Sequence, residues 1–133
     1  MRPKLLKTLS ILALAAPALA AAQTTSTLDK VKASGQITLA YRESSIPFSY
    51  LDDKAQPIGF GFEICQKIVD EVKKATGRAD LKVNLQAVTS ANRIPLLQNG
   101  TIDIECGSTT NNSDRGKQVQ FAALSPSTEP KLP

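Results

Sequence analysis

Segments with strand patterning alternate along this chain with segments of helical patterning, and this order limits the folds available to it. Apolar and polar residues alternate at 36–41 (QITLAY), 81–88 (LKVNLQAV) and 101–106 (TIDIEC). Apolar residues instead recur every three or four positions over residues 62–75. Strands that alternate with helices favour parallel pairing through right-handed crossovers. We therefore predict an α/β fold with a mainly parallel sheet flanked by helices.

Shorter elements are predicted around this framework. Ser26 or Thr27 can cap a helix that ends at Gly35, and residues 46–50 are expected to be extended, with a turn at 52–54. A helical turn is expected at residues 113–118. We predict one more strand at residues 119–122.

Residues 89–112 (TSANRIPLLQNGTIDIECGSTTNN) carry the densest polar signals in the sequence. Ser90 or Asn92 can cap a short helix, and Pro95 in its first turn favours Asn92. Gly100 is suited to the left-handed end of that helix. Arg93 at the helix start opposes the positive end of the helix dipole, a placement that a bound anion would compensate.

The predicted strands end in residues that can bind anions. Parallel strands release their chains at one edge of a sheet, where ligands usually bind. Guanidinium groups match carboxylates in shape and charge, and hydroxyl groups can add hydrogen bonds. We therefore predict a site for an anion with more than one carboxylate, formed by residues from all three strand ends: Arg42, Ser90, Arg93, Ser108 and Thr110.

Ordinary structural roles can also account for these residues. Arg42 and Arg93 could form surface ion pairs with Glu43, Asp103 or Glu105. Ser90 could act only as a helix cap. Ser108 and Thr110 could be plain loop residues.

Residues 1–22 have the pattern of a cleaved secretory signal peptide. A basic start precedes an apolar run, Pro17 and a series of alanines, with cleavage expected after Ala22 or Ala20. Removal of its three cations lowers the formal net charge from +4 to +1, which gives no electrostatic reason to expect nucleic acid as a partner. The sequence has no histidine, which excludes Ser-His and Cys-His nucleophilic pairs and most zinc sites. We predict no metal and no cofactor.

Export also permits disulfides, and the chain has two cysteines, Cys65 and Cys106. Cys65 falls within a predicted helix and Cys106 at the end of a predicted strand. A bond between them can form, but we favour a buried free thiol or a partner outside this chain.

Three strings make the chain resemble a known family. They are residues 42–50 (RESSIPFSY), 89–101 (TSANRIPLLQNGT) and 105–112 (ECGSTTNN). At these positions the sequence resembles the periplasmic substrate-binding proteins of polar amino-acid ABC transporters, in particular the glutamate/aspartate-binding group. The resemblance covers residues 27–122. It implies a type II fold of two lobes that close on the amino acid, and residues 23–122 would form the first part of lobe 1.

The resemblance also implies roles for the predicted site. Arg93 and Ser108 would hold the α-carboxylate, while Arg42 and Ser90 would hold the side-chain carboxylate with help from Thr110. A membrane ABC permease would be the partner of a monomeric, periplasmic, non-enzymatic receptor. Cys106 would pair with a later cysteine. The sequence does not decide between glutamate and aspartate.

Other features depart from the family pattern. Residues 123–133 (ALSPSTEPKLP) are rich in proline and are predicted to form a disordered tail outside the family. Family members are more than twice as long, so we expect a truncated fragment with weak or no binding. A non-functional remnant is one alternative. An exported dehydratase-like enzyme on the same fold is the other.

Overall fold

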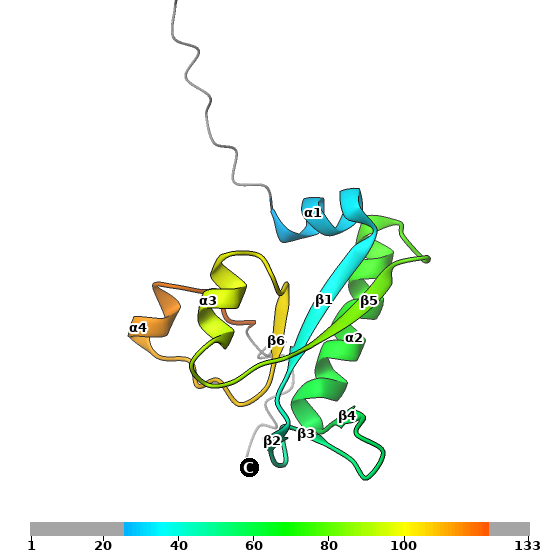
Figure 1. Ribbon diagram of the computed structural model, residues 1–133. Coiled ribbons are helices and arrows are strands. Elements are labelled where there is room, and N and C mark those ends of the chain that lie inside the picture. Colours follow the sequence, from blue (N-terminus) through cyan, green and yellow to red (C-terminus); the bar gives the residue numbers. More distant parts are fainter. Residues whose placement is uncertain (1–25, 123–133) are drawn as a thin grey trace, which may run out of the picture.

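The computed structural model describes residues 26–122, which contain a three-stranded parallel sheet at their centre (Figure 1). The strand order is β5 (Lys82–Ala87), β1 (Gln36–Tyr41), β6 (Ile104–Cys106). Both outer strands pair in parallel with β1, which confirms the predicted sheet. The predicted signal peptide and the predicted tail lie outside the described residues.

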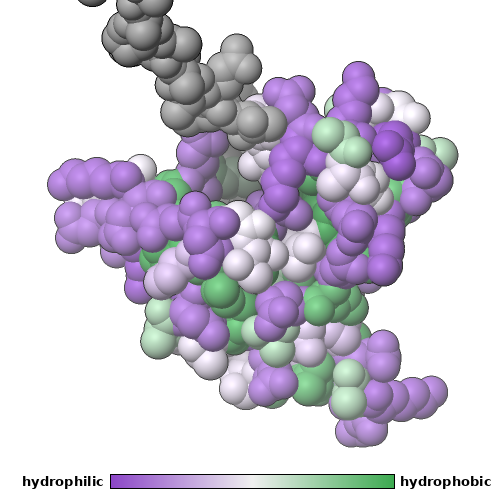
Figure 2. All heavy atoms as spheres, turned by 45° about the horizontal axis from the view of Figure 1, so that its top comes forward, coloured by the Kyte–Doolittle hydropathy of each residue, from purple (hydrophilic) through white to green (hydrophobic). Residues whose placement is uncertain are grey.

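Helices cover both faces of this sheet because side chains of a strand alternate between its two faces. Ile37 and Leu39 of β1 lie in a buried cluster with α2 (Phe60–Thr76) and α1 (Thr27–Ser34). Ala40 belongs to a second cluster, which Leu96 and Leu97 of α3 (Arg93–Gln98) cover. Hydrophilic side chains cover most of the face shown in Figure 2, where apolar groups form small areas between them. No helix among residues 26–122 combines the length and apolarity needed to cross a membrane.

A second, antiparallel sheet fills the segment between β1 and α2. It consists of β2 (Ser44–Ser45), β3 (Ser49–Leu51) and β4 (Pro57–Ile58). The sequence predicted extended chain and a turn here, but not the pairing. Asp52 shapes the turn, because its Oδ1 accepts hydrogen bonds from two backbone N–H groups, those of Lys54 and Gln56.

The helix ends partly match the expectations from sequence. Ser26 caps α1, since its Oγ accepts a hydrogen bond from Asp29 N–H, and Gly35 ends that helix in the left-handed conformation. Asn92 occupies the N-cap position of α3, as favoured from sequence, but its side chain makes no capping hydrogen bond to the helix. Instead, Thr89 Oγ1 accepts from Asn92 N–H at 3.3 Å, while Asn92 Oδ1 accepts from Thr89 N–H at 2.8 Å. This reciprocal pair begins the turn before α3 and resembles a capping box.

The last two predicted elements differ in the structure, where the helical turn is shorter and the strand is absent. The helical turn α4 spans Ser113–Gly116, and Asn112 caps it by accepting a hydrogen bond from Arg115 N–H. Residues 119–122 do not form the predicted strand. The sequence pattern alone could not supply a pairing partner for so short an apolar segment.

A disulfide joins Cys65 of α2 to Cys106 of β6, with 5.9 Å between the Cα atoms. The favoured expectation of a free thiol or an outside partner was therefore wrong, and so was the later mate for Cys106 that the resemblance implied. The reason is tertiary packing, because α2 crosses the sheet and brings its first turns against the carboxyl end of β6. Both residues are buried within the main core cluster.

We expect the disulfide to stabilise the fold substantially, since it closes a loop with a sequence separation of 41. Replacing both cysteines, as C65S/C106S, should lower the free energy of unfolding by about 2–4 kcal/mol. Urea denaturation with and without reductant measures the effect. Reductant should destabilise the natural chain and leave the double variant unchanged, and equal stability of the two proteins would contradict the expectation.

Candidate functional site

The three parallel strands end at one level, which places the following residues at the same edge of the sheet. Tyr41, the last residue of β1, lies opposite Ala87 of β5 and Cys106 of β6. The chain therefore leaves the sheet three times at this edge. It continues into Arg42 after β1, into the segment before Arg93 after β5, and into Gly107 after β6. This is the convergence expected from the strand order.

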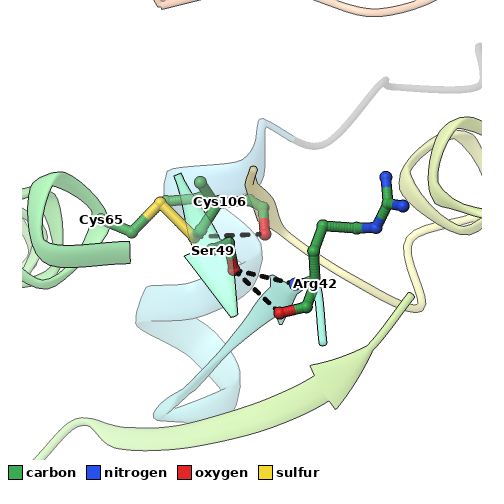
Figure 3. The surroundings of a disulfide bond; sticks show 5 residues. Arg42, Ser49, Cys65 and Cys106 are labelled. Carbon is green, nitrogen blue, oxygen red and sulfur yellow. Dashed lines mark hydrogen bonds between the residues drawn. A yellow bond between two sulfur atoms is a disulfide. The ribbon is translucent and has the colours of Figure 1, made fainter. Parts of the chain in front are cut away.

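Arg42 is the first of the cations at this edge. Its backbone is fixed by Ser49, whose buried Oγ accepts a hydrogen bond from Arg42 N–H at 2.9 Å and donates one to the Arg42 carbonyl at 3.3 Å. In Figure 3 the Arg42 side chain extends away from the disulfide. A Cβ added to Gly107 would lie only 2.9 Å from Arg42 Cγ, so the aliphatic stem of Arg42 packs over this glycine.

Arg93 is the second cation, and it is buried. The residue is 6% exposed at the first position of α3. Its Nη1 lies 3.7 Å from Glu105 Oε1, which is close enough for attraction but too long for a hydrogen bond. Arg93 Nε and Nη1 and Glu105 Oε1 have no hydrogen-bond partner among the described residues. Donors in this state are available to a ligand.

Electrostatics at Arg93 reflect its burial and its neighbours. Burial lowers the pKa of Arg93 from its ordinary value, and attraction by Glu105 opposes that change. Repulsion by Arg42 and by Arg115 lowers the pKa of Arg93 further. Positive charge from Arg42 and Arg115 therefore acts on buried Arg93.

Arg115 was not among the predicted site residues. It lies in α4, and its Nη1 donates a hydrogen bond to the Thr110 carbonyl at 3.1 Å, which fastens the loop after β6. The sequence signal that could have identified it is Asn112 three positions earlier, which caps α4 and turns the chain back. The sequence pattern predicts only a helical turn in this segment.

The three predicted hydroxyl groups differ in exposure. Ser108 is half-buried beside Gly107, whereas Ser90 and Thr110 are exposed. None of the three side chains has a hydrogen bond to another described residue. Thr109 lies in the same part of the chain and was not predicted. Its Oγ1 is buried and has no hydrogen-bond partner among residues 26–122. The ligand roles of the predicted residues therefore stay predictions.

The ordinary alternatives can now be compared with the geometry. Arg93 does face Glu105, but this pair is buried, unlike a surface ion pair. Asp103 pairs instead with Lys30, whose Nζ lies 2.8 Å from Asp103 Oδ1. The Asp103 carboxylate also accepts a hydrogen bond from Thr38 N–H. Arg42 has no ion pair among residues 26–122 within 4.0 Å.

A surface hollow of about 510 Å³ adjoins these groups. Its lining combines polar residues of the site with apolar residues of α2 and the small sheet; among them are Arg93, Glu105, Gly107, Thr109, Phe48 and Phe60. Among residues 26–122, no three side chains of histidine, cysteine, aspartate or glutamate come together as metal ligands. Of the five predicted site residues only Arg93 lines this hollow; Arg42, Ser90, Ser108 and Thr110 do not.

Comparison with known proteins now places the chain in a family. The family model of the bacterial extracellular solute-binding proteins, family 3, matches residues 37–130. The chain belongs to this family. The match continues into residues 123–130, which we predicted to lie outside the family and which fall outside the described structure.

Individual relatives agree with this assignment. The chain is 50% identical over 121 residues to the L-glutamate/L-aspartate-binding protein of Pseudomonas aeruginosa, covering 90% of this chain and 40% of the relative. It is 53% identical over 97 residues to the glutamate/aspartate import solute-binding protein of Escherichia coli, covering 73% of this chain and 32% of the relative. The chain therefore spans about a third to two fifths of these relatives.

Solved structures support the same fold. One match is an ancestral amino acid-binding protein described as a precursor of cyclohexadienyl dehydratase, with a TM-score of 0.59 and 28% identity. That match covers 69% of this chain and 37% of the other. The parallel sheet flanked by helices is part of the first lobe of a type II periplasmic binding protein fold, as the resemblance implied.

Gly107 provides a test of the site's packing. An added Cβ would collide with Glu105 Oε1 and with Arg42 Cγ, so G107A should displace both side chains and cost about 1–3 kcal/mol of stability. Urea denaturation measures the loss of stability. NMR of Arg93 measures how far its Nε–H group is exposed to water. The matched control is G116A, because a Cβ there meets only Asn111 Oδ1, at 3.8 Å. Equal results for the two variants would contradict this packing.

Proposed function

We propose that this chain is part of an exported solute-binding protein that captures an acidic amino acid, L-glutamate or L-aspartate, for an ABC importer. The observation that carries the proposal is buried Arg93 at the carboxyl edge of the sheet, whose Nε and Nη1 have no hydrogen-bond partner among residues 26–122. Carboxylates are the natural ligands of such donors. The names of the two curated relatives favour the same ligand class.

The proposed contacts divide the two carboxylates of the ligand between two groups of residues. Arg93 and Ser108 bind the α-carboxylate. Arg42 and Ser90 bind the side-chain carboxylate, and Thr110 assists from the loop. The burial of Arg93 supports its assignment, since a charge-assisted hydrogen bond is stronger where water is excluded.

We propose a setting for this function by analogy with the family. The signal peptide at residues 1–22 directs export, the receptor acts as a monomer in the periplasm, and a membrane ABC permease receives the amino acid. We further propose that the chain of 133 residues binds only weakly, with an affinity no better than millimolar. Ser90 and Thr110 are exposed. Polar contacts that are open to water contribute little to binding affinity.

Arg42 offers the sharpest test, because it is half-buried and replaceable with little effect on the core. R42Q should weaken L-glutamate binding roughly five- to tenfold by removing one charge-assisted contact. Chemical-shift changes during an NMR titration of the full chain measure this affinity. The control R78Q removes a guanidinium that pairs with Asp80 away from the site and should bind like the natural chain.

L-Glutamine serves as the control ligand, since it keeps the size of L-glutamate but lacks its second negative charge. It should bind more weakly than L-glutamate. Equal binding of both amino acids, or unchanged affinity of R42Q, would contradict the proposed site. Absence of any binding would favour the alternative of a non-functional remnant, and micromolar binding would contradict the proposed weak affinity.

A dehydratase-like enzyme is the second candidate, and one observation favours it. A structural neighbour is described as the precursor of a dehydratase. The absence of histidine removes the commonest general acid or base, so we propose a binding function rather than catalysis. Incubation with acidic cyclohexadienyl compounds distinguishes the two, because formation of an aromatic product would establish the enzyme.

A further inference from the structure

Glu105 is a largely buried carboxylate to which the proposed ligand contacts give no role. It lies in the middle of β6, and its side chain is 12% exposed. Its Oε1 has no hydrogen-bond partner among residues 26–122. A buried carboxylate without hydrogen bonds is costly unless nearby positive charge compensates it.

Two arginines approach Glu105 itself, and a third acts on its partner Arg93. Arg93 at the start of α3 lies 3.7 Å away. The stem of Arg42 and the carboxylate of Glu105 approach each other over Gly107. Arg115 of α4 is near enough to act electrostatically on Arg93. The carboxylate therefore lies beside Arg93 and the stem of Arg42, where it can attract Arg93 without occupying its donors.

Asp103, two residues earlier, shows how a carboxylate with a structural role is held. Its side chain is 5% exposed, pairs with Lys30 at 2.8 Å and accepts the backbone N–H of Thr38 at 2.8 Å. Among the residues that the structure describes, Glu105 makes no such bond to another side chain or to the backbone. The contrast indicates that Asp103 stabilises the fold through direct bonds, whereas Glu105 balances charge.

We propose that Glu105 is an internal counter-ion that positions Arg93 and sets the charge of the anion site. This inference rests on the proposed function. In the unliganded protein Glu105 offsets the mutual repulsion of three guanidinium groups. It leaves two positive charges in the cluster, which is the number that the two carboxylates of an acidic amino acid neutralise.

The experiment compares thermal unfolding of the full natural chain with E105Q, E105D and D103N in sodium chloride and in sodium sulfate of equal ionic strength. In chloride, E105Q should lower Tm by about 4–8 °C, because the guanidinium groups lose their counter-ion. Sulfate stabilises proteins generally, but it should raise Tm of E105Q more than that of D103N by occupying the unbalanced site. E105D keeps the charge and should show no additional response to sulfate.

Several results would overturn the counter-ion role. They are an E105Q variant as stable as the natural chain, equal sulfate responses of E105Q and D103N, and failure of E105Q to fold even in sulfate when D103N folds. A merely structural role of Glu105 predicts equal sulfate responses of E105Q and D103N. The sulfate response therefore distinguishes positioning of the cations from ordinary packing.

Titration with glutarate, a dicarboxylate without an ammonium group, adds an independent measurement. E105Q should bind glutarate several-fold more tightly than the natural chain at low salt, with a steeper dependence on salt concentration. Weaker binding by E105Q would overturn the proposal. If glutarate binds neither protein while the sulfate responses are as expected, the proposed function fails and the counter-ion role remains supported.

Discussion

Parallel pairing of β1 with both of its neighbours is the constraint on which the rest of this structure depends. Because Tyr41 lies opposite Ala87 and Cys106 at the same time, both crossovers must return the chain to one edge. A slip of one residue in the β1–β6 pairing, for example, would move buried Cys106 to the wrong face of the sheet. The packing of the two core clusters therefore also fixes the level at which the site residues leave the sheet.

Gathering three guanidinium groups at that edge opposes folding, since like charges repel and Arg93 also loses hydration. The protein tolerates this arrangement through partial compensation. Glu105 supplies attraction, and Ser49 and the Thr110 carbonyl fix the neighbouring backbone and side chains with hydrogen bonds. The compensation leaves donors free, and that is the state expected of a binding site before its ligand arrives.

Much of this architecture could be predicted from sequence because it depends on local periodicity. The parallel sheet, the long helix and the convergence of the strand ends follow from alternation and from strand order. The disulfide could not be predicted in this way, because it depends on where α2 crosses the sheet. Arg115 and Glu105 were missed for a similar reason, since their importance arises from charges that are far away in sequence.

The loop of residues 107–112 shows how these separate features act together. Its first end follows Cys106, which the disulfide holds against α2, and its second end is held by the cap of Asn112 on α4 and by the bond from Arg115 to Thr110. A loop fixed at both ends has little conformational entropy left to lose on binding. The hydroxyl and amide groups between those ends therefore contribute to affinity at a small entropic cost. The disulfide in the core and the third arginine act on the same property of the site, which is its preorganisation.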